Sequence, residues 1–234
     1  MLLRKNLLKA LLETPGLEYL VPLNEQTGTT AYDISGAGLN CTYSNVTLFQ
    51  TGSNPKVPVM ASFNGSSSII TVPTGASCKG KGVFTRVGVI EVTGTGLQNA
   101  SYESCGDNAT VSRFTTLLND KKCIIYVRTG LSSQTVSSFT STNTLADGVY
   151  LVHVEVDIPN DTIKVFANGT EVPGTTVINW GTDTAIVNTD PLLSLLGAGS
   201  STRYYAGRFA CSARYGRLLS AEEKVYQSRM GGFI

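Results

Sequence analysis

Residues 145–172, LADGVYLVHVEVDIPNDTIKVFANGTEV, constrain the fold of this chain more than any other stretch. Their first arm alternates between two kinds of side chain with a period of two. One face carries Tyr150, Val152, Val154, Val156 and Ile158, and the other carries Val149, Leu151, His153, Glu155 and Asp157. Successive side chains of a strand point to opposite faces, so this pattern predicts a β-strand.

The same stretch contains the signals that turn the chain back on itself. Pro159-Asn160-Asp161 has turn chemistry, because proline presets φ while Asn and Asp bond to their own backbone. Residues 162–167 are rich in residue types that favour strands. Asn168-Gly169 is the signal of a type I′ turn, after which another strand begins at Thr170. The stretch therefore predicts a β-hairpin followed by a third strand.

Short strand-like segments recur along most of the chain, with turn signals about every eight to twelve residues. They cover residues 17–21, 46–49, 57–63, 68–73, 83–92, 110–117, 123–128, 135–139, 185–188, 192–196 and 204–215. Residues 93–108 are expected to form a long loop, Asn64-Gly65 is a second hairpin signal, and Gly88 indicates a bulge or a close backbone approach. With 234 residues, 15% of them charged, the chain fits one all-β domain, an antiparallel jelly-roll sandwich.

Helical patterns occur at the two ends of the chain. Residues 2–13 predict a helix with an apolar stripe of Leu3, Leu7, Leu8, Ala10, Leu11 and Leu12. A helix of this length is marginal by itself in water, so it needs a partner surface. Three alternatives stay open: it caps the open end of the domain's own core, it docks on a neighbouring chain, or it has a membrane-surface or organelle-targeting role. At the other end, Ser220-Ala221-Glu222-Glu223 is a capping box that begins a helix over residues 220–230.

These boundaries divide the chain into a possible docking segment, residues 1–16, and a jelly-roll domain, residues 17–234. The candidate docking side chains are Leu3, Leu7, Leu8, Leu11 and Leu12. The net charge of +1 indicates neither a nucleic-acid nor an anionic-membrane partner. From Arg203 onward, six basic residues face only Glu222 and Glu223. This basic end is either a surface for a charged partner or a solvated face.

The five cysteines give no metal or redox motif, because their number is odd and no C-x-x-C pair occurs. Cys123 and Cys211 lie in apolar, strand-like runs and are expected to be buried thiols. A disulfide among Cys41, Cys78 and Cys105 stays open, although the count favours a reducing cytoplasm. No run approaches about twenty apolar residues, so no membrane span is predicted. No metal or cofactor is expected.

Four segments resemble, in order, the concanavalin A-like lectin/glucanase superfamily, specifically its laminin-G-like jelly roll. They are residues 20–36 (LVPLNEQTGTTAYDISG), 61–73 (ASFNGSSSIITVP), 145–172 and 206–223 (AGRFACSARYGRLLSAEE). The resemblance spans about residues 17–228 and implies a lectin-like jelly roll.

The chain departs from this family at positions that matter for ligand binding. Ala210 and Cys211 replace acidic residues of the last segment, and Asn64 and Ser68 replace aspartates of the second. Calcium needs several oxygen ligands together, so these departures argue against a calcium site. Val21 replaces a tryptophan that often follows the first strand, which removes one aromatic platform for a glycan.

His153, Glu155 and Asp157 are the sharpest candidates for catalysis, because their E-x-D spacing resembles that of the superfamily's retaining glucanases. Those enzymes need two carboxyls about 5–5.5 Å apart. Their usual third acid is absent, since Pro159 and Asn160 occupy its positions. The three residues therefore form a solvent-facing polar strand, a binding surface or a catalytic set. We assign no catalytic residue, and a single histidine without a neighbouring serine gives no Ser-His-Asp set.

Residues 15–25, PGLEYLVPLNE, preceded by a short Leu-rich helix, are similar to segments of tailed-bacteriophage particle proteins. This resemblance implies a non-enzymatic virion component, assembled in the host cytoplasm: a capsid decoration or a head- or tail-associated protein. Its partners would be other virion proteins, with a homo-oligomer as one arrangement. The alternative is a carbohydrate-binding module for a cell-surface glycan, with Trp180, Tyr204 and Tyr205 as stacking platforms unless they pack in the core. A glycoside hydrolase is the third hypothesis.

Overall fold

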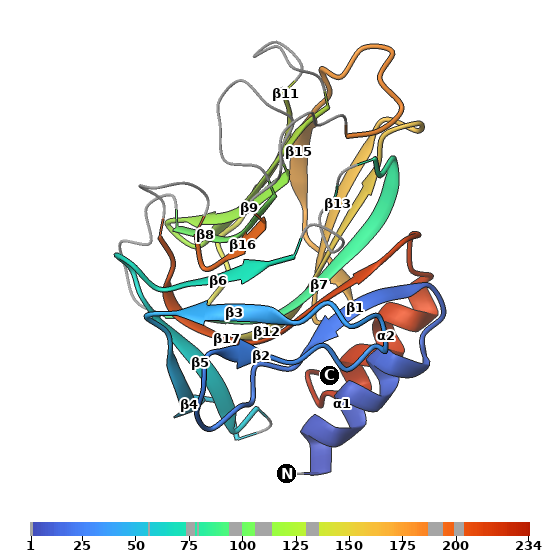
Figure 1. Ribbon diagram of the computed structural model, residues 1–234. Helices are drawn as coiled ribbons and strands as arrows, with labels where there is room; N and C mark the ends of the chain where they lie inside the picture. Colours follow the sequence, from blue (N-terminus) through green and yellow to red (C-terminus); the bar gives the residue numbers. More distant parts are fainter. Residues whose placement is uncertain are drawn as a thin grey trace.

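The computed structural model describes residues 2–55, 57–73, 78, 80–93, 100–105, 114–129, 136–186, 194–198 and 204–234. In this part of the chain two antiparallel β-sheets face each other, and two helices lie together outside one of them (Figure 1). The predicted all-β antiparallel sandwich is therefore confirmed.

Sheet A is the sheet that the helices cover. Its strand order is β14 (Thr170–Glu171), β13 (Thr162–Ala167), β12 (Gly148–Asp157), β7 (Val83–Val92), β17 (Ala206–Tyr215), β5 (Val59–Asn64) and β4 (Thr47–Thr51), and β1 (Leu17–Val21) also pairs with β17. Sheet B follows the order β15 (Gly174–Val177), β11 (Val136–Ser141), β10 (Lys122–Arg128), β9 (Phe114–Asn119), β8 (Ala100–Cys105), β16 (Ser194–Leu196), β6 (Ile69–Val72), β3 (Cys41–Ser44) and β2 (Thr30–Ala31). The helices are α1 (Leu2–Glu13) and α2 (Ala221–Met230).

The predicted hairpin is β12 and β13. Val152 pairs with Ala167 at one end of the ladder and Asp157 with Thr162 at the other. Asn168 and Gly169 have φ values of 53° and 80°, the left-handed conformation that a type I′ turn requires. Because β12 also pairs with β7 over its whole length, the hairpin lies inside sheet A and is not an edge.

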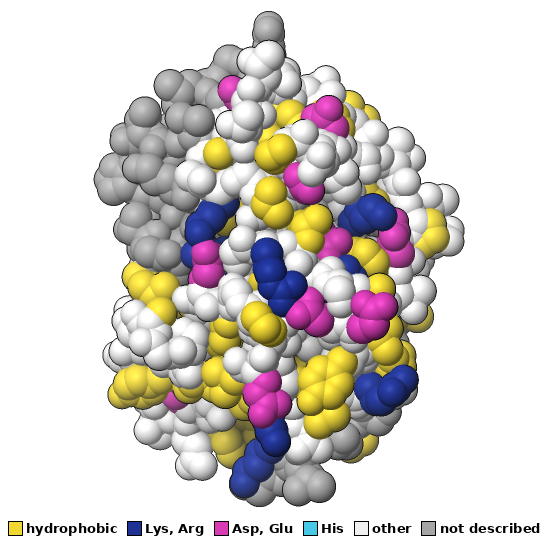
Figure 2. Space-filling view, turned by 90° about the vertical axis from the view of Figure 1, so that its right-hand side faces the viewer, with side chains coloured by type: hydrophobic (Ala, Val, Ile, Leu, Met, Phe, Trp, Pro, Cys, Tyr) yellow, Lys and Arg dark blue, Asp and Glu magenta, His cyan; other side chains and the backbone are white. Residues whose placement is uncertain are grey.

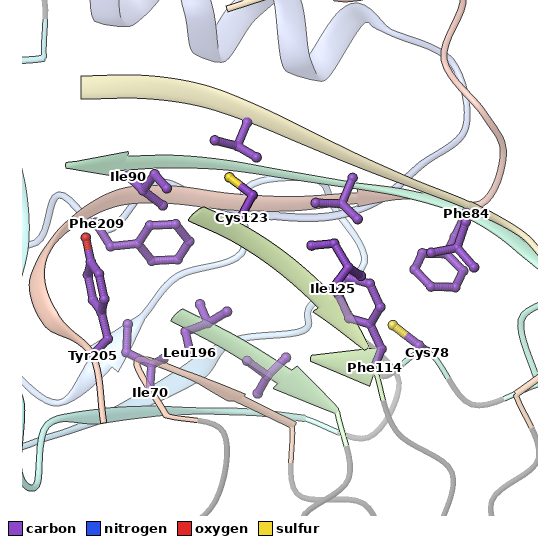
Figure 3. Close-up of a cluster of buried hydrophobic side chains, with 14 of the residues drawn as sticks. Ile70, Cys78, Phe84, Ile90, Phe114, Cys123, Ile125, Leu196, Tyr205 and Phe209 are labelled. Atoms are coloured by element: carbon purple, nitrogen blue, oxygen red, sulfur yellow. The ribbon is translucent and has the colours of Figure 1, made fainter. Parts of the chain in front are cut away.

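The main core fills the space between the two sheets. The apolar face of β12 contributes Val152, Val154 and Val156 to it. Figure 3 shows side chains of both sheets meeting there, and the rings of Phe84 and Phe114 pack edge to face with centroids 5.3 Å apart. Burial of these aromatic and branched side chains stabilises the sandwich.

A second apolar cluster lies between sheet A and the helices. Leu7 and Leu11 of α1 pack there against outward-facing side chains of the sheet, among them Val87, Leu151 and Ala213. Both helices lie beside β1 in Figure 1, and they contact each other. α1 therefore packs on its own domain, but it covers the outer face of sheet A and not the open end of the core that the first alternative expected. The capping box of α2 is confirmed: Ser220 Oγ accepts from Glu223 N, and Glu223 Oε2 accepts from Ser220 N.

Several segments differ from the sequence prediction. β8 lies inside residues 93–108, which were expected to be loop, and residues 185–186 are not a strand. Asn64-Gly65 does not form a hairpin, because β5 belongs to sheet A and β6 to sheet B. Asn64 instead organises a crossing between sheets, since its Oδ1 accepts from the backbone N–H groups of residues 66, 67 and 68. At Gly88 the close approach is confirmed: a Cβ there would lie 2.9 Å from the Phe209 ring.

Candidate functional site

The polar face of β12 is buried, so the solvent-facing interpretation of its three polar residues is wrong. His153, Glu155 and Asp157 are only 0%, 5% and 8% exposed. The cause is α2, which packs over this face of the strand and brings Lys224 into an ion pair with Glu155. Asp157 accepts from the backbone N–H and the side-chain amide of Asn160, at 3.2 and 2.9 Å.

This arrangement removes the proposed glucanase pair as a catalytic site. The Glu155 carboxylate is held by a buried cation, and Asp157 is used to cap the turn between β12 and β13. A general acid and a nucleophile must both reach a bound sugar, and neither residue is open to one. His153 and Glu155 therefore join β12 to α2, Asp157 caps the turn, and none of the three is open to a bound sugar.

The aromatic residues predicted to stack on glycans lie mostly inside the molecule. Trp180 is 1% exposed, and its indole N–H donates to Asp161 Oδ1 at 2.6 Å. Tyr205 is fully buried, and its hydroxyl donates to the Glu91 carbonyl at 2.6 Å. Tyr204 alone of the three is partly exposed. Core packing, the open alternative for these rings, is thus the outcome for Trp180 and Tyr205.

The leucines predicted for docking are mostly used within the domain. Leu7 and Leu11 are buried in the cluster between α1 and sheet A, and Leu8 packs partly against it. Leu12 is 41% exposed. The side chain of Leu3 lies outside the described residues. The apolar stripe of α1 therefore faces its own sheet and leaves little of itself for a neighbouring chain.

The basic C-terminal end is neutralised by acids from elsewhere in the fold. Arg208 pairs with Glu91, Arg214 with Glu18, Arg217 with Glu223 and Lys224 with Glu155. Three of these carboxylates belong to β1, β7 and β12. These strands lie far from the C-terminal end in the sequence, so the sequence alone did not indicate the ion pairs. Figure 2 shows basic and acidic side chains interspersed over the face that it presents. Arg203 lies outside the described residues.

An apolar groove lies beside α1. Its volume is about 520 Å³, within the range typical of small-molecule sites. α1, the segment after β1, strand β4 and the start of β5 supply its walls, through Lys5, Leu8, Asn24, Gln26, Phe49, Pro58 and Val59. We call this hollow the Phe49 groove.

Phe49 stands at the groove because the edge strand β4 bulges there. The pairing of β4 with β5 shifts register between Thr47 and Gln50. Phe49 has a φ of 55°, a backbone conformation that residues other than glycine seldom adopt. The residue is 46% exposed to solvent. The bulge thus presents an aromatic face to solvent at the wall of an apolar hollow.

The chemistry of the Phe49 groove suits a ligand with both apolar and hydroxyl surfaces. The ring, Leu8 and Pro58 offer apolar contact, while the exposed carboxamides of Asn24 and Gln26 can donate and accept hydrogen bonds. Lys5 is the one charged side chain among its described lining residues. Sequence reasoning placed Phe49 in a strand and missed its role, because alternation carries no sign of a bulge.

Two further hollows are more polar, and each has an ion pair of the fold among its lining residues. One of about 400 Å³ lies at β13 and β15, and Lys164 pairs with Glu171 at its wall. The other, of about 390 Å³, contains Glu91 and Arg208. Glu91 Oε1 also accepts from the Ser53 N–H at 3.0 Å, which ties the loop after β4 to sheet A. Both carboxylates already have partners within the fold.

The cysteines and the acidic residues give no sign of a metal centre in the described residues. No group of three His, Cys, Asp or Glu side chains there is arranged to hold an ion. Cys41 and Cys123 are buried free thiols, and burial raises the pKa of each to about 12. The side chain of Cys105 lies outside the described residues. Neither described helix has the length and apolarity to cross a membrane.

No family model and no curated protein matches the sequence. Among solved structures, the chain is similar to the binding domain of Paraclostridial Mosquitocidal Protein 1, with a TM-score of 0.68 and 12% identity over 91% of this chain and 52% of that one. It is similar to domain 4 of AbnA, a GH43 extracellular arabinanase from Geobacillus stearothermophilus, in complex with arabinotriose (TM-score 0.62, 13% identity, 91% and 98% covered). It is also similar to Trypanosoma rangeli sialidase in complex with sialic acid (TM-score 0.60, 13% identity, 93% and 34% covered).

The chain spans about half the length of the toxin binding domains it matches and nearly all of the arabinanase domain. At 12–13% identity, these similarities establish the fold alone. The chain has the β-sandwich fold of domains that include carbohydrate binders.

Proposed function

We propose that this protein is a carbohydrate-binding domain and that the Phe49 groove holds the sugar. The observation that carries the proposal is the exposed ring of Phe49, held at the groove by a strained backbone beside two carboxamides. A sugar ring presents an apolar C–H face, which packs on an aromatic ring, and hydroxyls at its rim, which bond to amides. The complex of the similar arabinanase domain with arabinotriose supports this class of ligand.

A glycan array followed by isothermal titration calorimetry tests the proposal, with the wild type and Phe49→Ala compared. Loss of an aromatic contact costs about 1 kcal/mol or more, so we expect affinity to fall about fivefold or further. Tyr226→Ala is the matched control, because Tyr226 is 43% exposed on α2 and does not line the groove. Equal affinity of wild type and Phe49→Ala for the same glycan would place the site elsewhere.

The proposed function is binding without catalysis. Glu155 and Asp157 were the residues on which a glycoside hydrolase activity depended, and both are occupied by contacts that hold the fold. We therefore favour the lectin-like alternative over the hydrolase. Turnover of a bound arabinose or sialic acid oligosaccharide by the wild type would contradict this choice.

A role in a bacteriophage particle remains a prediction that rests on the resemblance of residues 15–25. The burial of Leu7 and Leu11 within the domain argues against docking of the protein on a particle through α1. A glycan-binding component of a virion is compatible with the proposed function. Quantitative mass spectrometry of purified particles tests it: a copy number in fixed ratio to the major capsid protein supports the virion role, and absence from particles removes it.

A further inference from the structure

Gln227 of α2 connects both helices to sheet A. Its side-chain amide donates to Thr14 Oγ1 at 3.0 Å and to the Tyr215 hydroxyl at 3.2 Å. Thr14 Oγ1 donates to the Ala10 carbonyl, and the Tyr215 hydroxyl donates to the Leu11 carbonyl, each at 2.7 Å. Because both hydroxyls donate their protons to backbone carbonyls of α1, they can only accept hydrogen bonds from Gln227. The amide nitrogen of Gln227 is therefore its donor end.

This network determines which nitrogen of His153 carries the proton. The carbonyl oxygen of Gln227 is left to face His153 Nε2 at 2.9 Å, and a carbonyl can only accept. The proton of the neutral imidazole is thus on Nε2. Nδ1 is bare, buried and without a hydrogen-bond partner. The surroundings of His153 therefore satisfy the neutral imidazole with its proton on Nε2, and they offer no acceptor for a second proton on Nδ1.

A second proton on His153 would disrupt the contact between helix and sheet. It would place a positive charge on a side chain that is 0% exposed. The strands on either side offer Val87 and Phe166 beside it, and neither is an acceptor. The ammonium of Lys224 would repel a cation at His153, and Glu155 is already paired with that ammonium. Burial first, and then the Lys224 charge, lower the pKa of His153 to about 4.

We propose that His153 is an acid-sensitive latch that holds the helical layer on sheet A and controls the Phe49 groove. Protonation of Nδ1 leaves a buried cation without an acceptor, which favours states in which α2 lifts from β12 and exposes the imidazole. The Gln227 bonds to Thr14 and Tyr215 break with that movement, and α1 loses its hydrogen-bonded connection to α2. Because Lys5 and Leu8 of α1 form one wall of the groove, opening the latch weakens the groove. The part of this inference that concerns a ligand rests on the proposed carbohydrate-binding function.

The size of the effect follows from the two pKa values of the ring. In an opened state the imidazole regains its ordinary pKa of 6.5, against about 4 in the closed state. At pH 5 the ratio of opened to closed molecules then rises about twentyfold over its value at pH 7. Sequence offers a clean test, because His153 is the one histidine in the chain.

Hydrogen–deuterium exchange of the full chain at pH 7 and pH 5, corrected for the intrinsic exchange rate, measures the opening. We expect protection of peptides from α1 and α2 to fall about twentyfold at pH 5 in the wild type. His153→Gln keeps a side-chain N–H that can donate to Gln227 but does not titrate, so its protection should be independent of pH. Equal losses in the wild type and in His153→Gln would overturn the latch. NMR titration of the single histidine needs no variant: an apparent pKa near 6.5 in the folded protein would also overturn it.

The coupling to the groove has its own readout. Sialic acid and arabinotriose are titrated into the wild type and His153→Gln at pH 7 and pH 5. A pH-dependent loss of affinity in the wild type alone supports control of the groove. Binding that is equal at both pH values in the wild type overturns that control. If neither sugar binds at pH 7, the proposed function fails for these ligands, while hydrogen exchange still decides on the latch.

Discussion

Phe49 is in a backbone conformation that a strand does not need and a phenylalanine does not favour. Its φ of 55° lies in the left-handed region, which costs a residue with a Cβ about 1–2 kcal/mol. Backbone strain of this kind persists where the surrounding structure enforces it, and it is frequent at ligand sites. The bulge in β4 is what enforces it here, and it turns the ring toward the groove.

Two substitutions at this position separate strain from binding. Phe49→Ala and Phe49→Gly both remove the ring, so both should lose glycan affinity. Glycine adopts positive φ without a steric penalty, so Phe49→Gly should be more stable than Phe49→Ala by about 1 kcal/mol, despite glycine's greater freedom in the unfolded chain. Urea denaturation followed by circular dichroism measures the difference. A less stable glycine variant would mean that the backbone at Phe49 is not strained in solution.

The buried pair of Glu155 and Lys224 is a second case in which context decides what a residue does. Lys224 Nζ also donates to the Leu219 carbonyl at 2.8 Å and lies 4.1 Å from the centre of the Phe166 ring. Removing one partner of a buried pair leaves the other charge uncompensated, at a cost of about 3–5 kcal/mol. We expect Glu155→Gln and Lys224→Met each to destabilise by about this amount.

The double variant should be less destabilised than either single one, because it buries no unpaired charge. Denaturant unfolding of the four proteins completes the cycle. Strictly additive losses would show that the two side chains act independently.

At the scale of elements, local signals in the sequence were sufficient for the hairpin and for α2. Turn chemistry at residues 159–161 and 168–169 and the capping box at Ser220 each depend on a few neighbouring residues. The crossing at Asn64-Gly65 was mistaken for a hairpin, because the same dipeptide suits both and only distant pairing partners distinguish them. The sequence also carried no sign that α2 covers the polar face of β12. The two residues that pair across this contact, Glu155 and Lys224, are 69 residues apart in the chain.

Because α1 has a buried and an exposed face, we expect alanine substitutions at two adjacent leucines to change the free energy of unfolding by different amounts. Leu11 is fully buried against sheet A, whereas Leu12 is 41% exposed. Leu11→Ala should reduce the free energy of unfolding by about 2–5 kcal/mol, and Leu12→Ala by less than about 0.5 kcal/mol. Thermal and denaturant unfolding of the pair measure this. Similar small effects of both would mean that α1 is not packed on the sheet, and the docking alternative would regain its motive.

At the scale of the whole molecule, the protein is three layers thick: sheet B, sheet A and a layer made of helices from both ends of the chain. The middle layer is covered on both faces, which explains why β12 carries an apolar face toward one core and a mixed face toward the other. Leu151 belongs to the second apolar cluster, while His153 and Glu155 on the same face are matched to Gln227 and Lys224. Polar residues in that alternation look solvated in sequence because their partners lie far along the chain.

This layering predicts how stability depends on pH. The folded pKa of His153, about 4, lies below the unfolded value of 6.5, so the unfolded chain binds more protons between these values. Stability should be unaffected by His153 above pH 6.5 and should decrease as pH falls toward 4, by about 3 kcal/mol in total. The pKa values of Glu18, Asp33 and Glu223 are lowered by their partners, so these acids add losses only below about pH 4.5. Urea unfolding at pH 7, 5.5 and 4.5 therefore isolates the histidine. His153→Gln should remove most of the decrease over this range, and a variant that loses stability as steeply as the wild type would mean that His153 is not buried in its neutral form.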